Sequence, residues 1–123
     1  MKGPGERPAV LVYHHRSAPL PALREVCAGA EEEGVPTDVV EVADGGDVPD
    51  AITLAHAAAR ASRLEVGIGI DRSGVAAVHH GKLPERSPAT STGPDASPPE
   101  WRRAGRVGAR VVKGLPLTEA PRP

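Results

Sequence analysis

The fold of this chain is decided by the stretch LPALREVCAGAEEEGVP, residues 20–36. Its apolar residues recur at the i, i+3, i+4 and i+7 spacing of one helix face, namely Leu23, Val26, Cys27 and Ala30. Gly34, followed two residues later by Pro36, is typical of a helix end. The stretch therefore predicts a helix that begins near Leu20 and ends in three glutamates, with Cys27 as a buried thiol on its apolar face.

The last turn of this helix carries three consecutive carboxylates, Glu31, Glu32 and Glu33. The negative pole of the helix dipole lies at this end, so each exposed acid there costs roughly 0.3–1 kcal/mol. One interpretation is a solvated acidic turn whose cost the fold absorbs; the other is that a partner or a metal ion uses the charge. Carboxylate oxygens suit a hard cation, but neighbouring helical residues point about 100° apart, so at most one or two could reach one ion. The remaining ligands would come from elsewhere, such as another chain.

Strands are expected on both sides of this helix. Residues 9–13 form a continuous apolar run typical of a strand that is buried on both faces, and residues 38–42 predict a second strand. His14 and His15 follow the first strand at its carboxyl end, where ligands gather in open α/β sheets. They are candidate ligands or acid–base groups, although adjacent residues of an extended segment point in opposite directions. The alternative is an exposed loop over residues 14–19.

The middle of the chain predicts a second helix and a hairpin. Residues 51–61 are rich in Ala and follow Asp47, a good N-cap, and His56 is expected as a packed residue at the edge of the apolar face. Residues 66–71, VGIGID, predict a third strand whose alternating glycines leave one face bare, so that a backbone or a ligand can approach closely. Residues 75–79 predict a fourth strand that returns along the third.

The last third predicts a long loop and a third helix. Residues 82–99 are rich in Pro, Ser and Thr and have no periodicity, which is typical of a loop. A helix is expected from about Glu100 to Lys113, where Trp101, Ala104, Gly108 and Val111 form an apolar face. The same helix carries a basic stripe that is either a solvated face or a surface for a phosphate or an acidic partner: Arg102, Arg106, Arg110 and Lys113.

Together these elements predict an α/β fold. We expect a sandwich of order β-α-β-α-β-β-α around a mostly parallel four-stranded sheet, in which the fourth strand is an antiparallel hairpin strand. A chain of 123 residues has the length of one domain. We expect this domain at 8–117, an irregular loop inside it at 84–99, and flexible tails at 1–7 and 118–123.

Composition argues against several classes of function. A formal net charge of −1, with Trp101 and Tyr13 as the only aromatic residues, argues against a nucleic-acid binder. No apolar run approaches the ~18 residues that span a membrane, and the single Cys27 cannot form an intrachain disulfide, so the cytoplasm is the expected location. No spacing suggests a nucleophile–base pair. We therefore expect a binding module without catalytic residues.

Five segments occur in an order and spacing that resemble a known family. They are Leu23-Arg24-Glu25-Val26, Glu31-Glu32-Glu33-Gly34-Val35-Pro36, Val66-Gly67-Ile68-Gly69-Ile70-Asp71, Val78-His79 leading to Leu83-Pro84, and Ala109-Arg110-Val111-Val112-Lys113-Gly114-Leu115-Pro116. They look like the small subunit of diol/glycerol dehydratase reactivase and the homologous medium subunit of the coenzyme B12-dependent dehydratase. The resemblance covers roughly residues 8–117.

The two relatives imply different functions. The reactivase resemblance implies a non-catalytic small subunit in an ATP-dependent, chaperone-like complex, whose partner is a large ATPase subunit of Hsp70-like fold. That complex releases damaged cobalamin with ATP and magnesium, and the dehydratase medium subunit swaps into the place of the small subunit. The alternative is a medium-subunit-like component of the dehydratase, which contributes to cobalamin binding.

Sequence features favour one or the other relative. Val112-Lys113-Gly114-Leu115-Pro116 and the lack of an N-terminal extension look like the reactivase subunit, whereas Ala55-His56-Ala57-Ala58 and Gly67-Ile68-Gly69-Ile70 look like the medium subunit. The Lys-x-Leu-Pro segment of both appears here as Gly81-Lys82-Leu83-Pro84, with the lysine one place later, which puts a cobalamin contact of Lys82 in doubt. The short length favours the reactivase subunit.

The resemblance also implies a metal site. By alignment on Gly34, Glu32 corresponds to a glutamate that reaches a divalent metal at the large-subunit interface. We therefore expect Glu32 to complete a magnesium site in trans, with Glu31 and Glu33 beside it on the partner-binding surface. Dehydratase subunits are expected as transient partners, and the setting is the cytoplasm or a bacterial microcompartment. The sequence leaves open the dehydratase's substrate, the stoichiometry and the roles of four histidines: His14, His15, His79 and His80.

Overall fold

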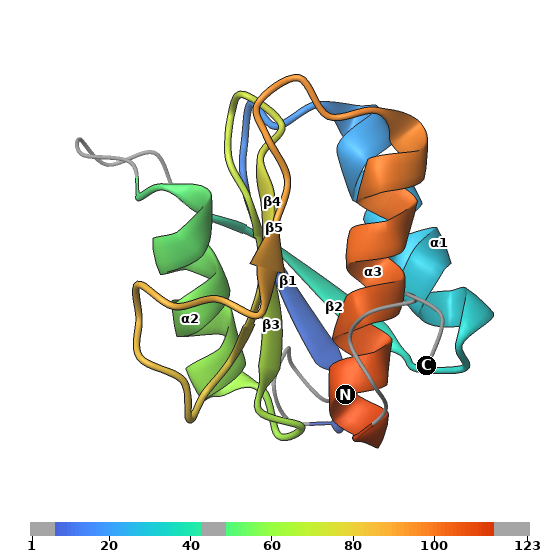
Figure 1. The fold of residues 1–123 in the computed structure, drawn as a ribbon, viewed down its shortest axis with the longest axis vertical. Coiled ribbons are helices and arrows are strands. Elements are labelled where there is room, and N and C mark those ends of the chain that lie inside the picture. The colour runs from blue at the N-terminus through green and yellow to red at the C-terminus, as the bar shows by residue number, and fades with distance from the viewer. Residues whose placement is uncertain (1–6, 43–48, 115–123) are drawn as a thin grey trace, which may run out of the picture.

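The computed structural model describes residues 7–42 and 49–114, which form three layers. A five-stranded sheet lies between α2 on one face and the pair α1 and α3 on the other (Figure 1). The elements follow the order β1 (Val10–His15), α1 (Leu20–Glu32), β2 (Thr37–Val42), α2 (Ala51–Ala61), β3 (Val66–Ile70), β4 (Ala76–His80), β5 (Thr90–Ser91) and α3 (Pro98–Lys113). None of these described helices is long and apolar enough to cross a membrane.

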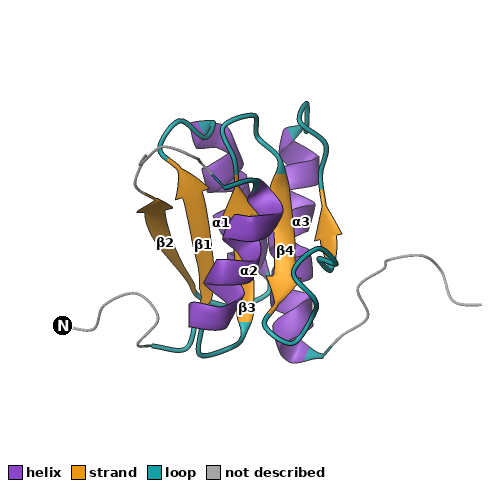
Figure 2. Ribbon diagram, turned by 90° about the vertical axis from the view of Figure 1, so that its left-hand side faces the viewer, coloured by secondary structure: helices purple, strands orange, loops and turns teal. Residues whose placement is uncertain are grey.

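The sheet has the order β2-β1-β3-β4-β5 (Figure 2). β1 is parallel to both β2 and β3, and β4 is antiparallel to β3, which confirms the predicted directions of the first four strands. The prediction of four strands was wrong, because β5 adds a fifth inside the segment that was expected to be irregular. Ala77 pairs with Ser91 and Val78 with Thr90, so a strand of two residues is held by pairing with a neighbour distant in sequence.

The bounds of β2, β3, β4 and α3 differ from the prediction by one or two residues, and two further differences concern predicted site or capping residues. β1 continues through His14 and His15, so these residues belong to a strand and the predicted loop begins later. The N-cap of α2 is Asp50, whose Oδ1 accepts a hydrogen bond from the backbone N–H of Thr53 at 2.8 Å. Asp47, the predicted cap, lies outside the described residues, as do the expected tails except for Arg7.

The main core lies between the sheet and the helices α1 and α3. Val12, Val26 and Ile68 are fully buried there, and the indole Nε1 of Trp101 donates a hydrogen bond to the carbonyl oxygen of Gly74 at 2.8 Å. Because the chain has no Phe, branched aliphatic residues and one indole fill this layer.

The layer between the sheet and α2 is thin, because it is built from Ala and Gly. A Cβ atom on Gly67 would lie 2.2 Å from the backbone nitrogen of Ala59, and one on Gly69 would lie 2.2 Å from the carbonyl oxygen of Ala51. The bare face of β3 is therefore filled by the backbone of α2. Of the two predicted explanations for the alternating glycines, close backbone approach is the one the structure supports.

The backbones of α1 and α3 are in close contact at two glycines. A Cβ atom on Gly29 would lie 2.0 Å from the carbonyl oxygen of Arg102, and one on Gly105 would lie 1.9 Å from that of Val26. This reciprocal contact fixes the two helices side by side, and it brings the acidic end of α1 against the basic stripe of α3.

Candidate functional site

The acidic turn lies where the sequence predicts it. α1 ends at Glu32, Glu33 is its C-cap, and Gly34 follows with a φ of 77°, a left-handed conformation that glycine adopts without strain. Glu31 and Glu32 are exposed, and Glu33 is half-buried. The three carboxylates therefore lie at the negative pole of the helix dipole, close to the solvent.

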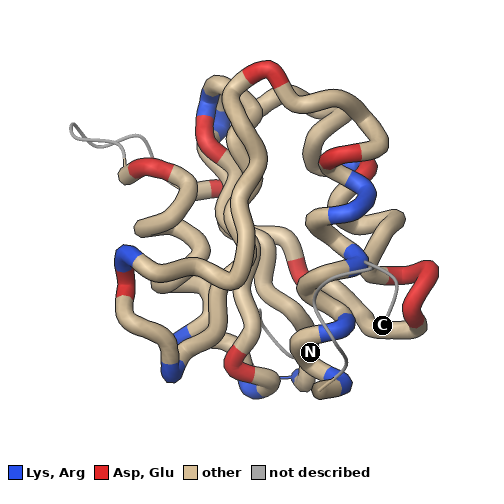
Figure 3. The backbone as a smooth tube through the Cα atoms, in the orientation of Figure 1, with Lys and Arg blue, Asp and Glu red and all other residues tan. Residues whose placement is uncertain are grey.

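Two of these carboxylates are paired with cations of α3. Arg102 Nη1 lies 2.8 Å from Glu32 Oε2, and Arg106 Nη1 lies 3.5 Å from Glu32 Oε1. Lys113 Nζ lies 3.5 Å from Glu33 Oε1. Figure 3 shows the acidic turn at the end of α1 beside the basic positions of α3. The acidic turn and the basic stripe are thus one surface, which we call the α1–α3 charge ladder.

Arg102 is the centre of this ladder. Its Nε donates to Glu25 Oε1 at 2.8 Å while its Nη1 donates to Glu32, so one guanidinium joins two carboxylates of α1. The hydrogen bonds from Glu25 and then Glu32 raise the pKa of Arg102 further above its usual value. Glu25 is half-buried beside Arg102.

The other ladder residues differ in their environment. Glu31 makes no ion pair with any residue of the described ranges. Arg110, the third residue of the predicted stripe, has its Nε buried without a hydrogen-bond partner in those same ranges. Burial raises the pKa of the Cys27 thiol, and the nearby charge of Glu31 raises it further. A thiol with a raised pKa is a poor nucleophile, which agrees with the predicted packing role.

The fit of a metal ion at this surface can be judged from the donors present. No group of three His, Cys, Asp or Glu side chains that could hold a metal occurs among residues 7–42 and 49–114. Glu32 offers oxygen ligands of the kind that magnesium takes, and its side chain is 45% exposed. The chain therefore fits such an ion as one ligand of a site that a second chain completes.

The first histidine pair lies at the carboxyl end of β1. His15 is buried, and its Nδ1 accepts a hydrogen bond from the backbone N–H of Ser17 at 2.9 Å. Its Nε2 is buried and has no hydrogen-bond partner within residues 7–42 and 49–114. The predicted exposed loop is therefore wrong for His15. His14 lies next to it on an extended strand, with its Nδ1 3.0 Å from the carbonyl oxygen of His15.

The second histidine pair, His79 and His80, lies at the end of β4. His79 and His56 both contact Glu85 in the segment that follows this strand. His79 is buried, and its Nδ1 accepts from the backbone N–H of His80 at 3.0 Å, so its Nε2 carries the proton and donates to the carbonyl oxygen of Glu85 at 2.8 Å. The His56 ring packs against His79 with centroids 4.7 Å apart, and its Nδ1 lies 3.8 Å from Glu85 Oε1. His56 is a packed residue, as predicted.

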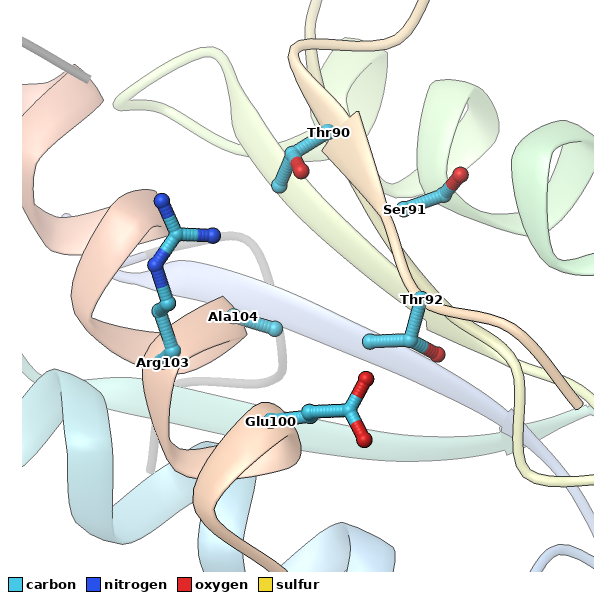
Figure 4. A pocket seen from close by; sticks show the side chains of 6 residues that line it. All are labelled: Thr90, Ser91, Thr92, Glu100, Arg103 and Ala104. Atoms are coloured by element: carbon cyan, nitrogen blue, oxygen red, sulfur yellow. The ribbon is translucent and has the colours of Figure 1, made fainter. Parts of the chain in front are cut away.

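A shallow hollow of about 80 Å³ lies between β5 and α3 (Figure 4). Its acid, Glu100, already accepts from Ser97 in a capping box at the start of α3. Sequence reasoning missed this hollow because it missed β5. It holds none of the predicted site residues, and it is lined by Thr90, Ser91, Thr92, Glu100, Arg103 and Ala104.

The chain is similar to known proteins over most of its length. Residues 7–118 match the model of the dehydratase medium subunit family. A curated protein of Citrobacter freundii, "Probable glycerol dehydratase-reactivating factor small subunit", is 35% identical over 109 residues, which cover 89% of this chain and 91% of that protein.

Two solved structures are also similar. "Glycerol dehydratase reactivase" superposes with a TM-score of 0.82 at 36% identity and covers 92% of this chain and 98% of that one. "Structure of diol dehydratase-reactivating factor complexed with ADP and Mg2+" gives a TM-score of 0.79 at 32% identity and covers 93% of this chain and 100% of that one.

Proposed function

The chain belongs to the dehydratase medium subunit family as a homologue of reactivating-factor small subunits, and we propose that it performs their task without catalysing a reaction itself. The observation that carries the proposal is the near-complete correspondence of lengths: the matches cover 91% of the curated small subunit and 98% of the reactivase chain. A small subunit implies a larger partner, so the function of this chain is to bind it.

We propose that the partner is a large ATPase subunit. The complex then uses ATP and magnesium to release damaged cobalamin from an inactivated diol or glycerol dehydratase, and this chain gives way to the dehydratase medium subunit. The unit that does so is the proposed domain 8–117, acting in the cytoplasm. The similarity to reactivating-factor small subunits, over 89% of this chain in sequence and 92% in structure, supports this proposal.

We propose the acidic turn as the contact with the large subunit. Glu32 supplies one oxygen ligand to a magnesium ion whose other ligands come from the partner, and Glu31 and Glu33 lie beside it on the same surface. A bound ion would neutralise charge between the two chains and so join them. The exposure of Glu32 supports this assignment, since a partner can reach it without moving the backbone.

The alternative is a subunit of the dehydratase itself that contributes to cobalamin binding. The description of the matching family, dehydratase medium subunit, keeps this function open. Lys82, the residue nearest to the family's lysine, is exposed in the turn after β4.

Co-purification separates the two functions. The full chain, tagged and expressed at native level in its own host, is isolated and its bound proteins are identified by mass spectrometry. We expect a large ATPase subunit in stoichiometric amount. Recovery of the catalytic dehydratase subunits in its place would establish the alternative.

A further inference from the structure

The carboxylate of Glu32, which the proposed function assigns to a partner's metal ion, is already engaged within the chain. Arg102 donates to Oε2 at 2.8 Å and Arg106 lies 3.5 Å from Oε1, so each oxygen faces one guanidinium. The three side chains are 45%, 34% and 29% exposed, in the order Glu32, Arg102, Arg106. This cluster lies at the surface, within reach of a docking protein.

The helices beneath the cluster are tightly packed. Gly29 and Gly105 bring α1 and α3 into backbone contact, where a Cβ atom would lie 2.0 Å and 1.9 Å, respectively, from a carbonyl oxygen of the other helix. Arg102 is held from a second side by Glu25 at 2.8 Å. The helix backbones therefore hold Arg102 and Arg106 close to Glu32, and rotation of side chains, chiefly that of the exposed Glu32, separates the carboxylate from the guanidinium groups.

A divalent cation and two guanidinium groups compete for the same carboxylate. All three are positive, and at the separations of one shared carboxylate they repel one another. A metal ion that binds Glu32 in its present position would lie next to both arginines. Metal binding therefore competes with the two ion pairs for the carboxylate of Glu32.

We infer that Arg102 and Arg106 form a latch that holds Glu32 in the free chain and releases it when a partner subunit brings a divalent cation. This inference rests on the proposed function of Glu32. In the free chain the two arginines neutralise the Glu32 carboxylate. A partner that brings no cation cannot replace these ion pairs, so it does not release Glu32. Exchange of this subunit would then depend on the free magnesium concentration.

Association measured against magnesium tests the latch. The full chain is titrated with its large subunit at a series of MgCl2 concentrations, by calorimetry, with Arg102→Gln, Arg106→Gln and Glu32→Gln as variants. Arg103→Gln is the matched control, since Arg103 is on the same helix, is exposed and makes no ion pair with the described residues. Melting curves followed by circular dichroism establish that each variant is folded.

The latch predicts that substitution of either arginine strengthens magnesium-dependent association and that Glu32→Gln weakens it. Arg106→Gln should tighten magnesium-dependent association by roughly two- to fivefold, the scale of one exposed ion pair. Arg102→Gln should act in the same direction, and Arg103→Gln should have no effect. Neither latch variant should change association in the Glu32→Gln background, where there is no carboxylate to release.

Three results would overturn the latch, and they can be told apart. If the arginine variants weaken association as Glu32→Gln does, the arginines position Glu32 for the metal. If they match Arg103→Gln while Glu32→Gln weakens association, the ion pairs impose no threshold, and the proposed metal role survives alone. If Glu32→Gln leaves the magnesium dependence intact, the metal role of Glu32 fails and the latch fails with it.

Discussion

At the scale of single residues, two glycines of β3 determine how closely the sheet and α2 pack. Gly67 and Gly69 are completely buried, and the space that a side chain would need is occupied by backbone atoms of α2. Backbone cannot move aside as the end of a flexible side chain can. The requirement for glycine here comes from close approach, since neither residue has a positive φ.

The first prediction concerns Gly69. Gly69→Ala places a methyl group 2.2 Å from the carbonyl oxygen of Ala51 and should lower the free energy of unfolding by about 1–3 kcal/mol, as overpacking does in protein cores. Gly93→Ala is the control, because a Cβ atom there has no neighbour within 4 Å, and it should change stability by less than about 0.5 kcal/mol. Urea unfolding gives both values. Equal stabilities would contradict the packing described here.

The second prediction concerns Asp50, whose pKa is lowered from 3.8 to about 2, first by Arg86 and then by the backbone N–H of Thr53. Because the folded value lies below the usual one, Asp50 contributes stability that is complete above about pH 4 and is lost as the pH falls through about 2. Asp50→Asn keeps an N-cap but loses the charge. Urea unfolding should show wild type more stable than the variant at pH 5, with most of that difference lost near pH 2. A difference that persists unchanged at pH 2 would refute this role of the charge.

At the scale of elements, the α1–α3 charge ladder offsets the unfavourable position of the acidic turn at the negative pole of the α1 dipole. Three acids at the end of α1 oppose the helix dipole, and two of them meet arginine and lysine side chains that suit it. Glu32 and Arg102 are separated by 70 residues, so no local pattern connects them. Because Gly29 and Gly105 have no side chain, the backbones of α1 and α3 come into contact. This contact sets the distance between the two charged rows.

The third prediction is that the ladder is electrostatic and therefore sensitive to salt. Arg102→Gln should lower the midpoint of thermal unfolding of the free chain by a few degrees at low ionic strength, and the difference should shrink near 1 M NaCl, where exposed charges are screened. Arg103→Gln, which removes the same charge from the same helix, should leave the midpoint in place. A loss of the same size at high salt would mean that Arg102 acts through packing.

Elements with a local signal were predictable, and those that depend on distant partners were not. The apolar spacing of residues 20–30, together with Gly34, predicted the position of α1. The Ala-rich run of residues 51–61 predicted the bounds of α2. β5 was missed because Thr90 and Ser91 have no alternation of their own and are ordered by β4. The burial of His15 was missed because a polar residue at a strand end is usually exposed.

At the scale of the whole molecule, the candidate site could be predicted in part. The acidic turn and the basic stripe were each evident from spacing, but their union in one surface required the fold. The family was evident because five short segments keep their order along the chain, and the match over residues 7–118 agrees with it. What the chain binds depends on a second protein, which no pattern within this sequence describes.

We identify this chain as the small subunit of a diol or glycerol dehydratase-reactivating factor, and a cobalamin-release assay tests that identification most directly. An inactivated diol or glycerol dehydratase with damaged cobalamin is mixed with the large ATPase subunit, ATP and Mg2+, and cobalamin release is followed by absorbance after separation from protein. Release and recovery of dehydratase activity should require this chain, and the dehydratase medium subunit should be found bound to the large subunit in the place of this chain. Equal release by the large subunit without this chain, or no release when all components are present, would contradict the claim.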